Sequence, residues 1–268
     1  MTVFEEVLVK MKTEFLSPIQ YYLCAETSFL NVNQLIDKKI SVSHIGYKCL
    51  NCRRTDIKIF RQGFCYDCFQ SSPQVGDWIM RPELSKAHLG IEDRDLEYET
   101  QVQLQPHAVY LATSSDVKVG VTRKTQIPTR WIDQGASKAI VVAEVPNRYL
   151  AGIAEVALKN HFTDKTNWRK MLQNQLNDFD LEEARKQCQE WLPQEVRPYF
   201  SESSPEIYEL NYPVEQFSTK INSLNLEKMP EYSGRISGIK GQYILFEDGT
   251  VFNVRSHEGY VTRIELLA

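Results

Sequence analysis

Four of the six cysteines form two pairs that have the spacing of metal ligands. Two residues lie between Cys49 and Cys52 and between Cys65 and Cys68, and twelve residues separate the pairs. Both thiolates of such a pair can face one ion, and structural Zn²⁺ takes four ligands in a tetrahedral arrangement. The spacing therefore predicts a zinc ribbon over residues 47–72, in which Zn²⁺ is structural because no coordination position remains open.

A second set of candidate residues needs a scaffold of strands and helices between residues 107 and 167. Apolar runs, a polar turn and a glycine stop signal predict, in chain order, strand 107–112, strand 117–121, helix 128–134 and strand 138–145. The first two strands are joined by a tight turn and should form an antiparallel hairpin. Asn147 is a candidate N-cap for a following helix that carries Glu155.

This order of elements resembles the GIY-YIG nuclease superfamily over about 65 residues. Ala108-Val109-Tyr110 stands where the first motif, Gly-Ile-Tyr, is expected, and Lys118-Val119-Gly120 where the second, Tyr-Ile-Gly, is expected. The family's arginine, metal-binding glutamate and downstream asparagine correspond to Arg130, Glu155 and Asn167. The whole layout also resembles an uncharacterised bacterial zinc-ribbon-containing family that has β-rich ends and the run at 126–136.

The resemblance implies metal-dependent hydrolysis of phosphodiester bonds in nucleic acid, with catalytic roles for Tyr110, Lys118, Arg130, Glu155 and Asn167. Tyr110 would act as a general base or orient the attacking water, and Arg130 would place a forked donor on the phosphate. Glu155 would hold one Mg²⁺ or Mn²⁺, with water in the remaining positions. Asn167 would complete the metal's shell or close the site.

The sequence departs from the family at Lys118, where the second motif has a tyrosine. A lysine there would support the phosphate, or lower the pKa of the Tyr110 hydroxyl because a nearby cation favours phenolate. It would otherwise mark a site that binds phosphate without hydrolysing it. The first motif's glycine is Ala108, which is a smaller change.

Each of these positions also has a purely structural interpretation. Tyr110 fits a half-buried strand aromatic, and Arg130 fits a cation stacked on the neighbouring indole ring. Glu155 fits a helix-surface acid paired with Lys159 one turn later. Asn167 fits the N-cap of the helix that follows it.

Charge is distributed unevenly along the chain. The formal net charge is −4, but residues 101–172 contain ten Lys or Arg and five Asp or Glu, which leaves about −9 for the rest. This excludes a globally basic nucleic-acid wrapper and favours phosphate binding at one place. No apolar run approaches the roughly 18 residues of a membrane span, and the first residues are acidic, so we expect a cytoplasmic protein with no membrane partner.

The expected fold class is α+β. Five parts are expected in chain order, namely a β-rich N-terminal module (1–46), the zinc ribbon (47–72), a connector (73–104), a GIY-YIG-like small antiparallel sheet with flanking helices (105–195) and a β-rich C-terminal module (214–268). The terminal modules are suspected to join into one β-barrel or open meander. Residues Phe4–Phe15 fit a helix or a strand.

Three functions remain open on the sequence alone. The first is a GIY-YIG-type nuclease with a structural zinc and catalytic Mg²⁺ or Mn²⁺. The second is a catalytically inactive zinc-ribbon protein that binds nucleic acid by gripping phosphate. The third is a scaffold with no affinity for nucleic acid. Whether the nucleic acid is DNA or RNA and what the oligomeric state is also stay open.

Overall fold

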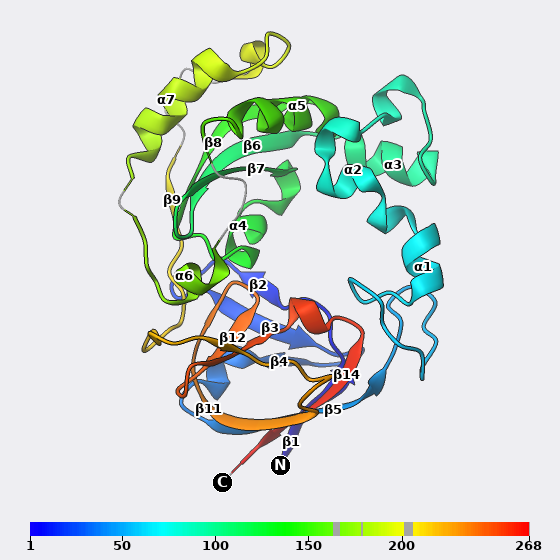
Figure 1. Cartoon of the computed structure of the whole chain (residues 1–268), viewed down its shortest axis with the longest axis vertical. Coiled ribbons are helices and arrows are strands. Elements are labelled where there is room, and N and C mark those ends of the chain that lie inside the picture. Colours follow the sequence, from blue (N-terminus) through cyan, green and yellow to red (C-terminus); the bar gives the residue numbers. More distant parts are fainter. Residues whose placement is uncertain (163–166, 178, 201–205, 268) are drawn as a thin grey trace. The chain divides into compact units, whose positions relative to one another are not determined.

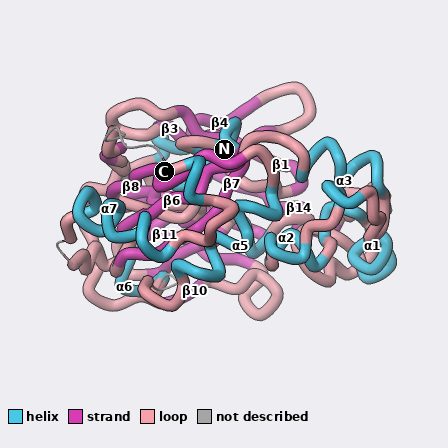
Figure 2. The backbone as a smooth tube through the Cα atoms, turned by 90° about the horizontal axis from the view of Figure 1, so that it is seen from above, coloured by secondary structure: helices cyan, strands magenta, loops and turns pink. Residues whose placement is uncertain are grey.

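The computed structural model describes residues 1–162, 167–177, 179–200 and 206–267. Strands hold more of these residues than helices do, and most helices are short (Figure 2). The mixed composition confirms the α+β class. The chain divides into two compact units, one formed by residues 1–70 with 210–268 and the other by residues 71–209.

The first unit is built on an open sheet of seven strands, β1-β14-β5-β11-β12-β13-β10 in spatial order (Figure 1). The strands are β1 (Thr2–Val7), β5 (Lys39–Tyr47), β10 (Asn222–Ser223), β11 (Glu231–Lys240), β12 (Tyr243–Phe246), β13 (Thr250–Asn253) and β14 (Tyr260–Leu266). N-terminal and C-terminal strands therefore share one sheet. Within the described residues β1 and β10 do not pair with each other, so the suspected closed barrel is wrong and the sheet is open.

A smaller sheet and short turns complete this unit. The sheet contains β2 (Lys12–Glu14), β3 (Gln20–Cys24) and β4 (Phe29–Asn31). The single-turn helices are η1 (Val32–Leu35), η7 (Arg255–His257) and, at the end of the cysteine segment, α1 (Tyr66–Ser71). Of the two alternatives for Phe4–Phe15, the strand is confirmed over the parts that form β1 and β2, and the helix is wrong. Residues of β1 pair with β14 from Thr2 to Val7, and this pairing outweighs a weak helical propensity.

The second unit contains a four-stranded antiparallel sheet in the order β7-β6-β8-β9. The strands are β6 (His107–Thr113), β7 (Val117–Arg123), β8 (Lys138–Val145) and β9 (Tyr208–Glu209). The hairpin of the first two strands and the third strand are confirmed. In the hairpin Tyr110 lies opposite Gly120, and Ala112 lies opposite Lys118. Side chains at alternate positions share a face, so Tyr110 and Lys118 are diagonal neighbours on one face.

The second unit also contains several helices, which are seen around the sheet in Figure 1. They are α2 (Asp77–Met80), α3 (Leu96–Gln103), α4 (Thr129–Asp133), α5 (Arg148–Leu158), α6 (Trp168–Leu172) and α7 (Leu181–Trp191), with the single turns η2 (Pro73–Val75), η3 (Pro82–Leu84), η4 (Ala87–Leu89), η5 (Lys124–Gln126) and η6 (Arg197–Tyr199). The odd-numbered valines of β7 pack with apolar residues of α5 and α7 in one core. The other face meets α4, where Trp131 packs edge-on against Tyr110.

The connector expected at residues 73–104 is folded into the second unit. Its acidic turn has a capping function, because the Asp95 carboxylate accepts a hydrogen bond from Tyr98 N at the start of α3. Glu99 is buried rather than solvated, and its two carboxylate oxygens accept the backbone N–H groups of Asp93, Arg94 and Asp95. These bonds fix the loop that precedes α3.

Among the described helices, none combines the length and the apolar character that crossing a bilayer requires.

Candidate functional site

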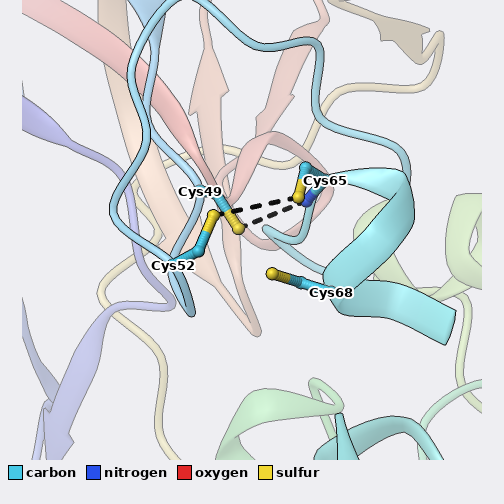
Figure 3. Close-up of side chains that lie close together, drawn as sticks. All are labelled: Cys49, Cys52, Cys65 and Cys68. Carbon is cyan, nitrogen blue, oxygen red and sulfur yellow. Dashed lines mark hydrogen bonds between the residues drawn. The ribbon is translucent and has the colours of Figure 1, made fainter. Parts of the chain in front are cut away.

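The four paired cysteines converge in the first unit. Their Sγ atoms all lie within 4.8 Å of one another, and Figure 3 shows them directed toward a common point. A tetrahedral zinc site with Zn–S bonds near 2.3 Å has sulfur atoms about 3.8 Å apart, so the cluster needs only slight contraction around an ion. Of the described residues, these are the ones that gather as a metal-binding group, and they could hold a metal such as zinc.

The surroundings favour the thiolate form at Cys52 but not at Cys68, whose pKa is raised to about 11 because burial and hydrogen bonds with the neighbouring cysteines outweigh the lowering effect of Asn51. Cys65 N donates to Cys49 Sγ at 3.3 Å, and the Arg54 guanidinium donates to Cys52 Sγ at 3.4 Å and to Cys65 Sγ at 3.6 Å. The hydrogen bond from Arg54 lowers the pKa of the Cys52 thiol to about 6. Four thiol groups are the donor set that structural Zn²⁺ takes, and ligation would deprotonate them, so the residues present fit such an ion.

The local fold around the cysteines is less regular than a ribbon hairpin. The β-pairing within residues 48–64 consists of two isolated bridges, Lys48 with Thr55 and Arg61 with Phe64. The second cysteine pair lies at the start of α1, which begins directly after Cys65. Turns and isolated bridges, rather than a continuous β-ladder, therefore bring the two pairs together.

A pocket of about 270 Å³ lies in the second unit at β7, the edge strand of its sheet. Side chains from β6, β7, α4 and α5 reach it from both faces of the sheet. The lining residues are Ile79, Met80, Pro82, Tyr110, Lys118, Val119, Gly120, Val121, Arg130, Gln134, Arg148, Glu155 and Lys159. The pocket thus brings together four of the five positions that the sequence singled out, namely Tyr110, Lys118, Arg130 and Glu155.

Tyr110 is held in place by the glycine opposite it. A Cβ atom at Gly120 would lie 2.6 Å from Tyr110 Oη and 2.7 Å from Cζ, so the ring fits only because Gly120 has no side chain. The hydroxyl donates to Gln134 Oε1 at 3.0 Å. Burial raises the pKa of Tyr110, and this outweighs the opposing effect of Arg130. The phenol is therefore neutral at neutral pH, and the separate influence suggested for Lys118 on this pKa stays a prediction.

Lys118 is buried in the same pocket. Its pKa is lowered to about 7, mainly because burial disfavours the charged ammonium and also because the charge of Arg130 repels it. Glu155 acts in the opposite direction but does not compensate. Close to neutral pH, Lys118 is therefore present in both charged and neutral forms.

Glu155 carries the pocket's carboxylate. It lies 3.6 Å from Lys159 one helical turn later, which confirms the structural pairing expected for this residue. Burial raises the pKa of Glu155, although Lys159 and Arg148 both favour the carboxylate. Pairing with Lys159 and exposure to the pocket are compatible, because the side chain keeps 12% of its surface accessible.

Asn167 is not among the described residues that line the pocket. Its side chain accepts a hydrogen bond from Lys170 N at 3.2 Å and caps α6, which confirms the structural interpretation of this residue. Residues 163–166, which precede it, lie outside the described residues.

The sequence argument missed Arg148, Lys159 and the three apolar residues Ile79, Met80 and Pro82. Arg148 and Glu155 are seven residues apart on α5, a spacing that places both on one face of a helix. Lys159 follows Glu155 by four residues on the same face. This periodicity was the available signal, whereas no local pattern marks the three apolar residues as pocket lining.

Comparison with known proteins identifies the family but no activity. No curated protein and no solved structure shows significant similarity to the chain. Residues 37–262 match the model of a family described as "Protein of unknown function (DUF2797)". This match covers most of the chain and includes the four clustered cysteines and every residue of the pocket. The chain therefore belongs to the DUF2797 family.

Proposed function

We propose that this protein is a metal-dependent nuclease of the GIY-YIG type that hydrolyses phosphodiester bonds at the pocket around Glu155. The observation that carries the proposal is that Tyr110, Lys118, Arg130 and Glu155 line one pocket. They come from two strands and two helices, and the four types of side chain supply the proton-transfer, phosphate-binding and metal-binding groups that the reaction requires.

Electrostatics support an anionic ligand. The pocket is lined by four basic side chains, Lys118, Arg130, Arg148 and Lys159, against the single carboxylate of Glu155. A partly buried site with excess positive charge attracts phosphate more strongly than the protein surface does, because water screens the charges less. Because the whole chain has a net negative charge, phosphate binding is expected at this pocket rather than over the rest of the surface.

The two candidate proton-transfer groups have different roles in this proposal. Tyr110 keeps its proton at neutral pH and donates to Gln134, so it orients groups in the pocket rather than removing a proton. Lys118 has a neutral fraction near pH 7 and is the group suited to accept a proton from the attacking water. Arg130 contributes forked donors to the phosphate oxygens.

Glu155 provides the pocket with one carboxylate ligand for a hard divalent cation. Mg²⁺ is commonly bound by one or two carboxylates, with waters and substrate phosphate filling the other positions, and the pocket offers one carboxylate. When bound, such an ion would stabilise negative charge on the phosphate and on the leaving oxygen. Glu155 would have to exchange its ion pair with Lys159 for the cation, which releases Lys159 toward the phosphate.

We propose that the four cysteines hold a structural Zn²⁺ ion. Four sulfur donors fill a tetrahedral shell, so no position remains for a substrate or a reactive water. Arg54 bridges the cluster and Asp67, with a distance of 3.0 Å between Arg54 Nη2 and Asp67 Oδ2. Zinc here would hold together a segment that contains turns and little regular structure.

A second candidate function is phosphate binding without hydrolysis. The contact of 3.6 Å between Glu155 and Lys159 favours it, because an ion-paired carboxylate is a weaker metal ligand. The raised pKa of Glu155 acts in the same direction. In this case the same pocket would position single phosphates of a nucleic acid and leave the backbone intact.

Cleavage and binding assays on Glu155→Gln separate the two functions. The nuclease predicts Mg²⁺- or Mn²⁺-dependent cleavage of labelled DNA or RNA that the variant loses while it retains salt-sensitive binding. Glu144→Gln is the matched control, since Glu144 is an exposed acid paired with Lys124 in the same unit. Binding without cleavage by the wild type under either metal supports the second function. Absence of binding at low salt refutes both.

A further inference from the structure

The pocket has an apolar wall that the catalytic residues do not explain. The wall consists of residues 77–84, which form α2 and η3, and its side chains Ile79, Met80 and Pro82 line the pocket together with the basic groups. This segment lies outside residues 105–195, where the catalytic positions were expected. A phosphate group gains nothing from contact with an apolar surface. The wall therefore indicates that the ligand also has an apolar part.

The wall is fixed firmly to α5. Arg148 donates from Nε to Trp78 O at 3.1 Å and from Nη2 to Ile79 O at 2.8 Å, and its guanidinium lies over the Trp78 ring. A Cβ atom at Gly152 would lie 2.2 Å from Glu83 N and 2.4 Å from Pro82 C. The backbone of α5 therefore contacts the backbone of the wall directly at Gly152. This contact fixes the position of the wall relative to Glu155, which also lies on α5.

Met80 is the most exposed of the three apolar side chains of the wall. It keeps 75% of its surface accessible, although it is a large apolar side chain that borders a cationic pocket. Binding pockets commonly combine apolar lining with a few convergent polar groups, so an apolar wall beside four basic side chains fits a ligand that is anionic at one end and apolar at the other. A nucleotide has this character, since a phosphate is joined to the flat face of a base.

We propose that the pocket binds a phosphate together with its own unpaired base, and that the protein therefore selects single-stranded over double-stranded nucleic acid. The phosphate lies against Lys118 and Arg130, and the base packs on Met80. A base in a duplex is stacked and paired, so it cannot cover Met80 without being extruded, which costs free energy. The inference rests on the proposed binding of nucleic acid at this pocket and names the class of its substrate.

The test compares the affinity of the full chain for a fluorescein-labelled ten-nucleotide single strand and for the duplex of the same sequence, by anisotropy at low salt. The wild type should bind the strand about tenfold more tightly than the duplex. Met80→Ser should reduce this ratio to nearly one. Leu89→Ser is the matched control, because Leu89 is an exposed apolar residue 63% accessible in the same unit and does not line the pocket. It should keep the wild-type ratio.

The other results overturn the inference and can be told apart. Equal affinity for strand and duplex refutes strand selection, and so does a strand preference that Met80→Ser leaves at the level of Leu89→Ser. Failure of the wild type to bind either nucleic acid refutes the proposed function and this inference together. Strand-selective binding without cleavage under Mg²⁺ or Mn²⁺ refutes the nuclease and leaves the inference standing.

Discussion

The ring of Tyr110 occupies the space that a side chain at Gly120 would need. The two residues are direct partners across β6 and β7, and a Cβ atom at Gly120 would lie 2.6 Å from the tyrosine hydroxyl oxygen. This contact joins the last residue of the first motif to the last residue of the second. It also directs the hydroxyl toward Gln134 on the opposite side of the pocket. The glycine is therefore part of what positions the tyrosine.

Gly120→Ala should displace Tyr110 and destabilise the protein. The added methyl group overpacks a buried site, for which a cost of about 1–3 kcal/mol in the free energy of unfolding is expected. Urea denaturation measures the effect. Gly46→Ala is the control, because a Cβ at this strand glycine would meet only Val261 Cβ at 4.0 Å. Equal stability of the two variants would contradict the contact.

Lys118 should make stability depend on pH. Its pKa is about 7 in the folded state and near 10.4 in the unfolded chain. Between these values the unfolded chain binds more protons, so the free energy of unfolding rises with pH across this window, by at most about 1.4 kcal/mol per pH unit. Above the unfolded pKa the amine of Lys118 is neutral in both states and does not destabilise the fold. As the pH falls toward 7, protonation of the unfolded chain progressively lowers the free energy of unfolding.

The comparison that isolates this effect is with Lys118→Met. Denaturant unfolding at several values between pH 7 and pH 10 should show a steeper rise for the wild type than for the variant. The buried Lys240, whose pKa is lowered to about 8, is present in both proteins and cancels. Parallel stability curves would mean that the Lys118 amine titrates normally.

The pH dependence of activity should distinguish the two proposed functions. If neutral Lys118 accepts a proton from water, the cleavage rate rises as the pH increases through about 7. If cationic Lys118 binds phosphate, affinity for an oligonucleotide falls over the same range. In Lys118→Arg the side chain stays charged over this pH range, so the change in cleavage rate or in affinity near pH 7 should disappear. A wild type that lacks both steps would exclude Lys118 from both roles.

Removal of the metal should destabilise the first unit. Purified protein is expected to contain about one zinc ion per chain by elemental analysis, and Cys68→Ser should lose it. The melting temperature should fall in this variant and in wild type treated with a chelator. Cys24→Ser is the control, because Cys24 lies outside the cluster. Full zinc content in Cys68→Ser would exclude a four-cysteine site.

Glu99→Gln should loosen the loop before α3. The carboxylate accepts from three backbone N–H groups, with Oε1 taking two of them at 2.7 Å and 3.1 Å and Oε2 the third at 3.0 Å. An amide replaces one acceptor oxygen with a donor that faces an N–H group, so a loss of about 1–3 kcal/mol in stability is expected. Glu97→Gln, an exposed position on the same helix, should change the stability little.

Local signals were sufficient for several parts of the fold. The polar turn between two apolar runs predicted the β6–β7 hairpin, and Asn147 caps α5 as expected, with its Oδ1 accepting from Leu150 N at 2.9 Å. The spacing of the cysteines predicted a cluster because each pair is a local motif. Such features depend on residues close in sequence, where the chemistry of a turn, a cap or a knuckle is decided.

Features that depend on distant residues could not be predicted. Residues 2–7 became a strand because β14 pairs with them, more than 250 residues later in the chain. The pocket wall depends on hydrogen bonds from Arg148 to carbonyl groups about 70 residues earlier. Neither partner carries a local pattern that identifies the other, so the pocket-lining position of Met80 had no signal in the sequence.

The order of strands in the seven-stranded sheet has a consequence for synthesis of the protein. β14 lies between β1 and β5, so these two early strands do not pair with each other. Each of them pairs with residues 260–266, which are synthesised last of the three. Residues 71–209 are contiguous and can fold as they leave the ribosome. The first unit, in contrast, completes its sheet only after translation of β14, and until then the edges of β1 and β5 that pair with β14 have no partner strand.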